Sequence, residues 1–152
     1  MSNTQTPSKI GNVEKELRYI SGIIKQKGRE ILHHYPITAP QFVALQWLMD
    51  SGDMTIGELS NKIHLACSTT TDLVDRMEKN QLVERVRDPD DRRVVQIHAL
   101  HKGKEIIDEV IEKRKDYLHD VLSEVSEEEV ETLNNLLNLL HNKMVDADHK
   151  TD

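Results

Sequence analysis

One hairpin constrains the fold of this chain more than any other segment does. Residues 82–103 read LVERVRDPDDRRVVQIHALHKG, with two β-rich runs, 82–87 and 94–100, around six residues that are all Asp, Pro or Arg. This pattern predicts two antiparallel strands joined by a long charged tip. Arg92 and Arg93 lie in the tip, where guanidinium groups can reach a phosphate or enter a groove. The preceding segment decides whether this hairpin is an ordinary turn or a wing.

That preceding segment, residues 55–80, has the proportions of a helix-turn-helix. Thr55-Ile-Gly-Glu58 is a capping box that opens a short helix through residue 63, and a longer helix is expected over 67–80. Small hydroxyl side chains at its start permit close approach to a major groove, and a basic residue follows two turns later. These candidate DNA contacts are Ser68, Thr69, Thr70, Thr71 and Arg76. The alternative is a helix cap followed by solvated surface.

A hairpin directly after a helix-turn-helix makes a winged helix, whose wing can place an arginine in the minor groove. The acidic residues Asp88, Asp90 and Asp91 oppose this role by their charge. We expect Asp91 to pair with Arg93 or with a neighbouring backbone amide and so to aim the guanidinium. The alternative is an exposed ion-pair loop that contributes little.

Helices are predicted on both sides of this region. Apolar residues at helical spacing predict a first helix over about 9–34, which Pro36 stops, and Thr38-Ala-Pro-Gln41 is a capping box for the second. Another long helix follows the hairpin, and Ser126-Glu-Glu-Glu129 opens the last one. That last helix carries a coiled-coil-like seam, formed by Val130, Leu133, Leu137, Leu140 and Met144. The fold class is therefore mainly α with a small hairpin: four helices, hairpin, two helices.

The composition favours an oligomer. Only 37% of the residues are hydrophobic and 31% are charged, with a single Trp and a single Phe, so a monomer would have a thin core. No apolar run approaches the roughly 18 residues of a membrane span. The one cysteine, Cys67, suits a reducing compartment.

The net charge of −7 at first opposes nucleic-acid binding, but its distribution does not. Residues 101–152 hold 14 acidic and 7 basic side chains, which accounts for the whole excess. The hairpin region is close to neutral, with clustered arginines. Phosphate contacts are therefore permitted without strong non-specific affinity.

Three stretches in order resemble the MarR (multiple antibiotic resistance regulator) family of bacterial winged-helix transcription factors, along nearly the whole chain. They are Thr38-Ala-Pro-Gln-Phe-Val-Ala-Leu45, then Ser68-Thr-Thr-Thr-Asp-Leu-Val-Asp-Arg-Met-Glu78 with Leu82-Val-Glu-Arg85, and Asp88-Pro-Asp-Asp-Arg-Arg93 continuing to Gly103. The last stretch is the most specific.

The resemblance implies a homodimer whose first and last helices intertwine, while two winged-helix lobes read an inverted-repeat operator in double-stranded DNA. Dimerisation helices would occupy residues 1–36 and 101–152. The lobe would occupy 37–100, with the helix-turn-helix at about 55–80 and the wing at about 82–100. Arg93, supported by Asp91, matches the family's minor-groove position. A cytoplasmic, nucleoid-associated repressor that responds to a ligand or to stress is the expected function.

Three residues depart from the family's usual pattern. Ala66 stands where members often have Ser, so the cap of the recognition helix is expected to shift to Cys67 or Ser68. Asp72 is acidic where a basic or polar residue is commoner, and its carboxylate can accept a hydrogen bond from a cytosine amino group. His101 replaces the usual Thr. The first two affect the operator sequence rather than the fold.

The resemblance also implies a signal, either a small phenolic or anionic effector or oxidation of a cysteine. The candidate crevice residues are His33, His34, Tyr35 and Trp47. For Trp47 a core position is the stronger alternative, and for the histidines a favourable interaction with the helix dipole. Cys67 is the redox candidate, although burial within the helix-turn-helix is the expectation for it.

A non-DNA protein-interaction module is the alternative function, since winged helices also bind proteins. An enzyme is not expected, because there is no Gly-rich phosphate loop and no Ser/His/Asp constellation. No cofactor is expected, and no metal, because no His-x3-His or Cys-x2-Cys pair occurs within a predicted helix.

Overall fold

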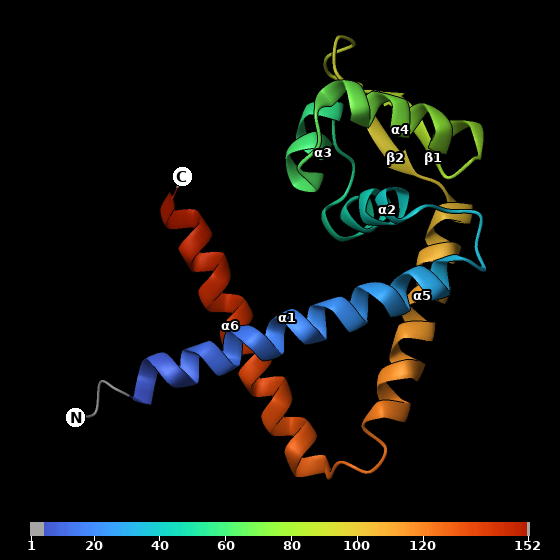
Figure 1. Cartoon of the computed structure of the whole chain (residues 1–152). Coiled ribbons are helices and arrows are strands. Elements are labelled where there is room, and N and C mark those ends of the chain that lie inside the picture. Colours follow the sequence, from blue (N-terminus) through green and yellow to red (C-terminus); the bar gives the residue numbers. More distant parts are fainter. Residues whose placement is uncertain (1–4, 152) are drawn as a thin grey trace. The chain divides into compact units, whose positions relative to one another are not determined.

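The computed structural model describes residues 5–151, and the side chains of residues 8–150. The chain divides between Arg114 and Lys115 into two compact units. The first holds α1 (Gln5–Leu32), α2 (Ala39–Ser51), α3 (Ile56–Ile63), α4 (Cys67–Lys79), β1 (Val83–Arg87), β2 (Val95–Ala99) and the start of α5 (His101–Val121). The second holds the rest of α5 and α6 (Glu127–Thr151). The predicted fold class and element order are confirmed (Figure 1).

Local sequence signals start the helices where they were expected. Thr38 forms a reciprocal capping box with Gln41. At Thr55 and at Ser126 the hydroxyl oxygen accepts the backbone N–H of the glutamate three residues later, as in a capping box. The carboxylate of that glutamate, however, accepts a hydrogen bond from the same hydroxyl. The first helix ends at Leu32, two residues earlier than predicted.

One apolar core holds the winged lobe together. It is built from buried residues of α2, α3, α4, the hairpin and the first turns of α5, and from α1 it takes Ile31 and Leu32. β1 and β2 pair antiparallel, with Arg85 opposite Ile97, and an isolated bridge joins Met54 to Ile97. Figure 1 shows the loop between the strands projecting from the edge of the lobe on which α4 lies.

Gly103 makes the closest backbone approach in this lobe. A Cβ atom built there would lie 2.6 Å from the carbonyl oxygen of Leu82 and 2.9 Å from Leu45 Cδ2. The carbonyl cannot move away freely, because it accepts the N–H of Leu100 at 2.9 Å where the hairpin closes. Position 103 therefore requires a residue without a side chain.

We expect Gly103→Ala to lower the free energy of unfolding by about 1–3 kcal/mol, since overpacking outweighs the gain in helix propensity. Chemical denaturation measures the change. Gly57→Ala in α3 is the matched control, because its nearest neighbour would be 3.9 Å away, and it should be neutral or stabilising. Equal stability of the two variants would contradict the packing argument.

Candidate nucleic-acid interface

The second helix of the helix-turn-helix, α4, begins without a side-chain cap. Ala66 is the N-cap residue, in extended conformation, and no side chain accepts a hydrogen bond from the first turn. The expectation that Cys67 or Ser68 would be the cap is wrong, because both lie inside the helix. The N-cap residue itself, Ala66, has only a methyl side chain, which cannot accept a hydrogen bond. The first-turn N–H groups are thus left for solvent or for an anion.

The hydroxyl residues at the start of α4 divide into two groups. Ser68 and Thr69 are exposed. Thr70 is completely buried and donates its hydroxyl hydrogen to the carbonyl of Ala66 at 3.0 Å. Thr71 is half-buried and donates to the carbonyl of Cys67 at 2.9 Å. Thr70 has no surface to offer a ligand, which corrects its place among the expected contacts.

Two acidic side chains of α4 are bound by one arginine from β1. The guanidinium of Arg85 donates to Asp75 at 2.6 Å and to Glu78 at 2.7 Å, and its backbone N–H donates to Glu78 at 3.2 Å. Burial of Arg85 disfavours its charged form, but the hydrogen bonds and attraction of Asp75 and Glu78 outweigh this effect and raise its pKa. This clamp, formed by Asp75, Glu78 and Arg85, fastens α4 to the hairpin.

We expect Arg85→Ala to lower the free energy of unfolding by about 1 kcal/mol and to speed amide exchange in β1 and β2, because the partners lie in different elements. Thermal unfolding and hydrogen exchange measure both effects. Arg18→Ala is the control, since Arg18 pairs with Glu14 four residues away in a single exposed helix. If the two variants behaved alike, the clamp would have no structural importance.

The tip of the hairpin is ordered by its acidic residues. Asp88 accepts the backbone N–H groups of Asp90 and Asp91, at 2.8 and 3.3 Å. Asp91 accepts the backbone N–H of Arg93 at 3.1 Å and its Nε at 3.2 Å, as the sequence predicts. The guanidinium of Arg87 donates to the backbone carbonyl of Arg92 at 3.1 Å.

This arrangement fixes the base of the Arg93 side chain and leaves the rest in solvent. The side chain of Arg93 is 92% exposed. Its hydrogen bonds, first from the guanidinium and then from the backbone, lower the pKa of the Asp91 carboxyl. The Asp91–Arg93 pair is therefore present at neutral pH and is lost only as the pH falls through this lowered pKa.

Comparisons with known proteins fit this geometry. The sequence model of the MarR family matches residues 37–95, which include the helix-turn-helix and most of the hairpin. The HTH-type transcriptional regulator YsmB of Bacillus subtilis is 60% identical over 135 residues, which cover 89% of this chain and 92% of YsmB. The chain belongs to the MarR family.

A solved structure and a more distant relative agree with that assignment. A MarR family protein from Bacillus stearothermophilus is 58% identical, with a TM-score of 0.86 over 90% of this chain and 96% of that one. The transcriptional repressor MdtR of Bacillus subtilis is 25% identical over 121 residues, 80% of this chain and 78% of MdtR. The protein is a DNA-binding transcriptional regulator, so the alternative of an interaction module without DNA binding is set aside. Its relatives are transcription regulators rather than enzymes.

The single thiol of this MarR protein is exposed, at the first residue of α4. Its expected burial is wrong: Cys67 shares the side of the helix that buries Thr70, Val74 and Met77, but it lies in the first turn, where its side chain stays exposed. Cys67 therefore adjoins Ser68 and Thr69 on the surface.

We expect alkylation of Cys67 with N-ethylmaleimide to weaken DNA binding at least about tenfold, because the adduct would lie at the start of the second helix of the helix-turn-helix, which is expected to enter the groove. Fluorescence anisotropy with labelled duplex measures the loss. Cys67→Ser, treated in the same way, should be unaffected. Unchanged affinity of the alkylated protein would remove Cys67 from the interface.

The four expected crevice residues differ in burial and lie outside the two pockets described below. His33 and His34 are exposed and their rings meet edge to face, with 6.2 Å between centroids. Tyr35 and Trp47 are half-buried against the core, and the ammonium of Lys62 lies 5.0 Å from the Trp47 ring centroid. None of the four predicted residues lines either of the two pockets described next.

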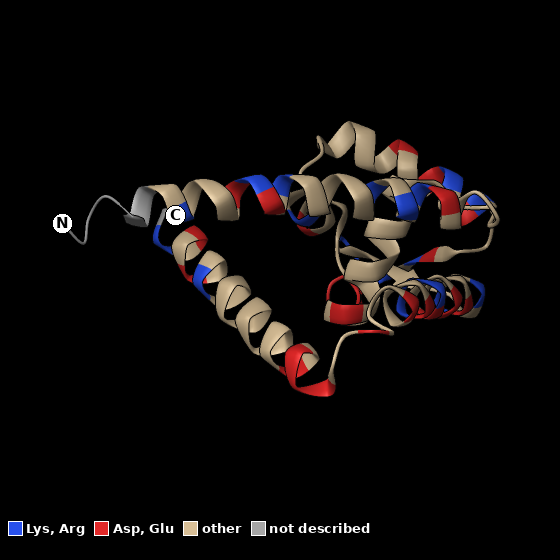
Figure 2. Cartoon of the chain, turned by 60° about the horizontal axis from the view of Figure 1, so that its bottom comes forward, with Lys and Arg blue, Asp and Glu red and all other residues tan. Residues whose placement is uncertain are grey.

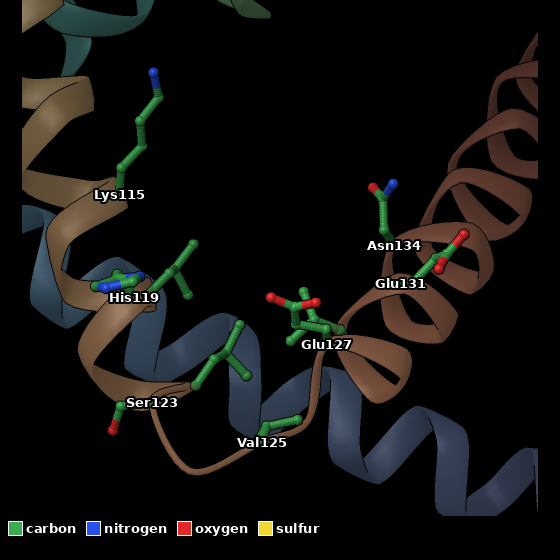
Figure 3. Close-up of a pocket in the computed structure, with 10 residues that line it drawn as sticks. Lys115, His119, Ser123, Val125, Glu127, Glu131 and Asn134 are labelled. Carbon is green, nitrogen blue, oxygen red and sulfur yellow. The ribbon is translucent and has the colours of Figure 1, made fainter.

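Both pockets were missed by sequence reasoning. One, of about 380 Å³, lies beside Asp53 and His98, whose carboxylate and ring nitrogen are 2.8 Å apart although 45 residues separate them. The other, of about 900 Å³, lies in the second unit between the end of α5 and the start of α6 (Figure 3). The apolar side chains that line it are Leu118, Leu122, Val125 and Val130, and the acidic side chains that line it include Glu127 and Glu131.

Long apolar faces are uncovered in the helices outside the lobe. On α1 the side chains of Ile10, Val13, Ile20, Ile23 and Ile24 are 47–63% exposed. On α6 Leu136, Leu137 and Leu139 are 51–58% exposed, within a run from 132 to 142 that holds no charged residue. Figure 2 shows this uncharged stretch after the acidic first turn of α6. In the described residues no helix could cross a membrane, and no three His, Cys, Asp or Glu residues are grouped for a metal ion.

Proposed function

We propose that the protein acts as a homodimeric repressor that binds an inverted-repeat operator and releases it in response to a ligand or to stress. The observation that best supports DNA recognition is the structure of the wing tip, where Asp91 holds the base of an almost fully exposed Arg93 side chain. An arginine presented in this way suits a narrow, electronegative minor groove. Blocking access of the transcription machinery to the operator would make the regulator a repressor.

The proposed contacts to DNA come from α4 and the wing. On α4, the residues that would contact the major groove or its phosphates are Ser68, Thr69, Thr71 and Arg76. On the wing, Arg92 and Arg93 would contact the adjacent minor groove or its phosphates. Thr70 is left out because it is buried. A regulator with these contacts would work in the cytoplasm, at the nucleoid.

The uncovered apolar faces support the homodimer. Exposed apolar surface of this extent is costly in water, and a second copy supplies an equally apolar partner. The dimer would use residues 1–36 and 101–152, including the groove between α5 and α6, and residues 37–100 would form each lobe. Two lobes related by a two-fold axis would read half-sites about one helical turn apart, hence the inverted repeat.

The environment of Arg114 supports the proposal that the effector is an anion. Its Nε is buried without a hydrogen-bond partner among the described side chains, and its guanidinium carbon lies 4.6 Å from the ring centroid of Phe42. A Cβ at Gly28 of α1 would lie 3.3 Å from another of its nitrogens. A carboxylate reaching this position would satisfy the unpaired donor.

Selection of bound fragments from genomic DNA tests the function. We expect enrichment of a two-fold symmetric sequence, and binding to it that weakens steeply as salt rises, because phosphate contacts release counterions. A shuffled duplex of equal length is the control. Failure to enrich any sequence over the shuffled duplex would contradict the proposal.

A further inference from the structure

The acidic side chains of α4 differ in what they contact. Asp75 and Glu78 are both paired with Arg85 in the clamp. Asp72 is exposed, and its carboxylate has no hydrogen-bond or ion-pair partner in the part of the chain that the structure describes. It is therefore the acidic group of this helix that is free to meet a ligand.

Asp72 also occupies the centre of the exposed face of α4. The helix buries Thr70, Val74 and Met77. Thr69 lies three residues before Asp72 and Arg76 four residues after it, so these neighbours share its side of the helix, and both are exposed. A duplex that contacts Thr69 and Arg76 would also meet Asp72.

The chemistry of a carboxylate at this position limits what it can bind. Near phosphates an unpaired carboxylate is repelled, and it can only accept hydrogen bonds. In the major groove the available donors are the amino groups of cytosine and adenine. Adenine places its N7 acceptor beside the amino group, whereas cytosine presents N4 as a donor without an acceptor of its own in the groove. Cytosine is therefore the base that a carboxylate prefers.

We propose that Asp72 is a specificity-determining residue that selects a cytosine at one position of each half-site. The inference rests on the proposed DNA-reading role of α4 and adds to it the identity of one base. Asp72 discriminates against the other three bases, and the neighbouring Arg76 offsets part of its repulsion from the backbone.

The test compares base preferences among the wild type, Asp72→Ala and Asp72→Asn after selection from a random duplex pool. The wild type should prefer cytosine at one symmetric pair of positions, by about fivefold or more over each other base. Asp72→Ala should lose that preference and no other. Asp72→Asn should change it to adenine, because an amide can donate to N7 and accept from N6. Glu109→Gln removes the same charge from an exposed position of α5 instead of α4 and should keep the wild-type preference.

The outcomes separate the inference from the function on which it rests. If the wild type enriched a symmetric sequence and both Asp72 variants kept its base preferences while binding all duplexes more tightly, Asp72 would only repel phosphate and the inference would be overturned. If the wild type enriched nothing, the proposed function would fail together with the inference. Loss of cytosine preference in both variants, with the rest of the motif unchanged, supports the inference.

Discussion

Replacing Leu137 by glutamate is expected to separate the proposed dimer into monomers. Leu137 lies on the predicted seam of α6 and is 51% exposed in the single chain. Burial of a leucine contributes about 1.5–3 kcal/mol, and a two-fold interface contains the position twice. About half of that burial remains available to Leu137, and the substitution also places a carboxylate in the interface, so together the dissociation constant of the dimer should rise at least about a hundredfold. Sedimentation equilibrium measures the change.

The neighbouring polar position supplies the control for this variant. Asn138 follows Leu137 directly, lies off the seam and is exposed. Asn138→Glu adds the same charge and should leave the dimer intact. A Leu137→Glu protein that remained dimeric at micromolar concentration would show that the uncovered face of α6 has another purpose. A monomeric variant should also lose operator affinity, since one lobe alone makes half of the contacts.

Arg93→Ala should give the second largest effect, a loss of operator affinity with little change in stability. One arginine contact in a groove contributes about 1–3 kcal/mol, and the symmetric complex loses two of them. Affinity should therefore fall by about thirtyfold or more. The fold should be unaffected because the side chain is 92% exposed. Anisotropy titrations at constant salt, with thermal unfolding in parallel, measure the two quantities.

Two further variants define what Arg93 contributes. Arg93→Lys keeps the positive charge but loses the planar guanidinium group, so its operator affinity should lie between those of Arg93→Ala and the wild type. Arg92→Ala removes the adjacent guanidinium, while the backbone carbonyl that accepts the hydrogen bond of Arg87 remains. We expect it mainly to reduce the salt dependence, as the loss of a phosphate contact does. Full affinity of Arg93→Ala would exclude the wing from the mechanism.

The sequence predicted the features that depend on neighbours along the chain. The Thr38 capping box involves residues three apart, and the hairpin and its Asp91–Arg93 pair are also local. The burial of Thr70 and the exposure of Cys67 were not predicted, because both depend on which turns of α4 the core covers. The clamp was missed for a similar reason. Arg85 lies ten residues from Asp75, and their meeting depends on α4 packing against β1.

The clamp also bears on how a signal can reach DNA. Arg85 binds α4 to the hairpin, and the bridge between Met54 and Ile97 connects the hairpin to the segment before α3. We therefore expect the lobe to move as one body, with α4 and the wing shifting together. In the proposed dimer, an effector would act by changing the spacing or the tilt of two rigid lobes. The separation of the two half-sites that the dimer can bind, rather than the DNA-contacting surface of either lobe, would then be the property that the signal changes.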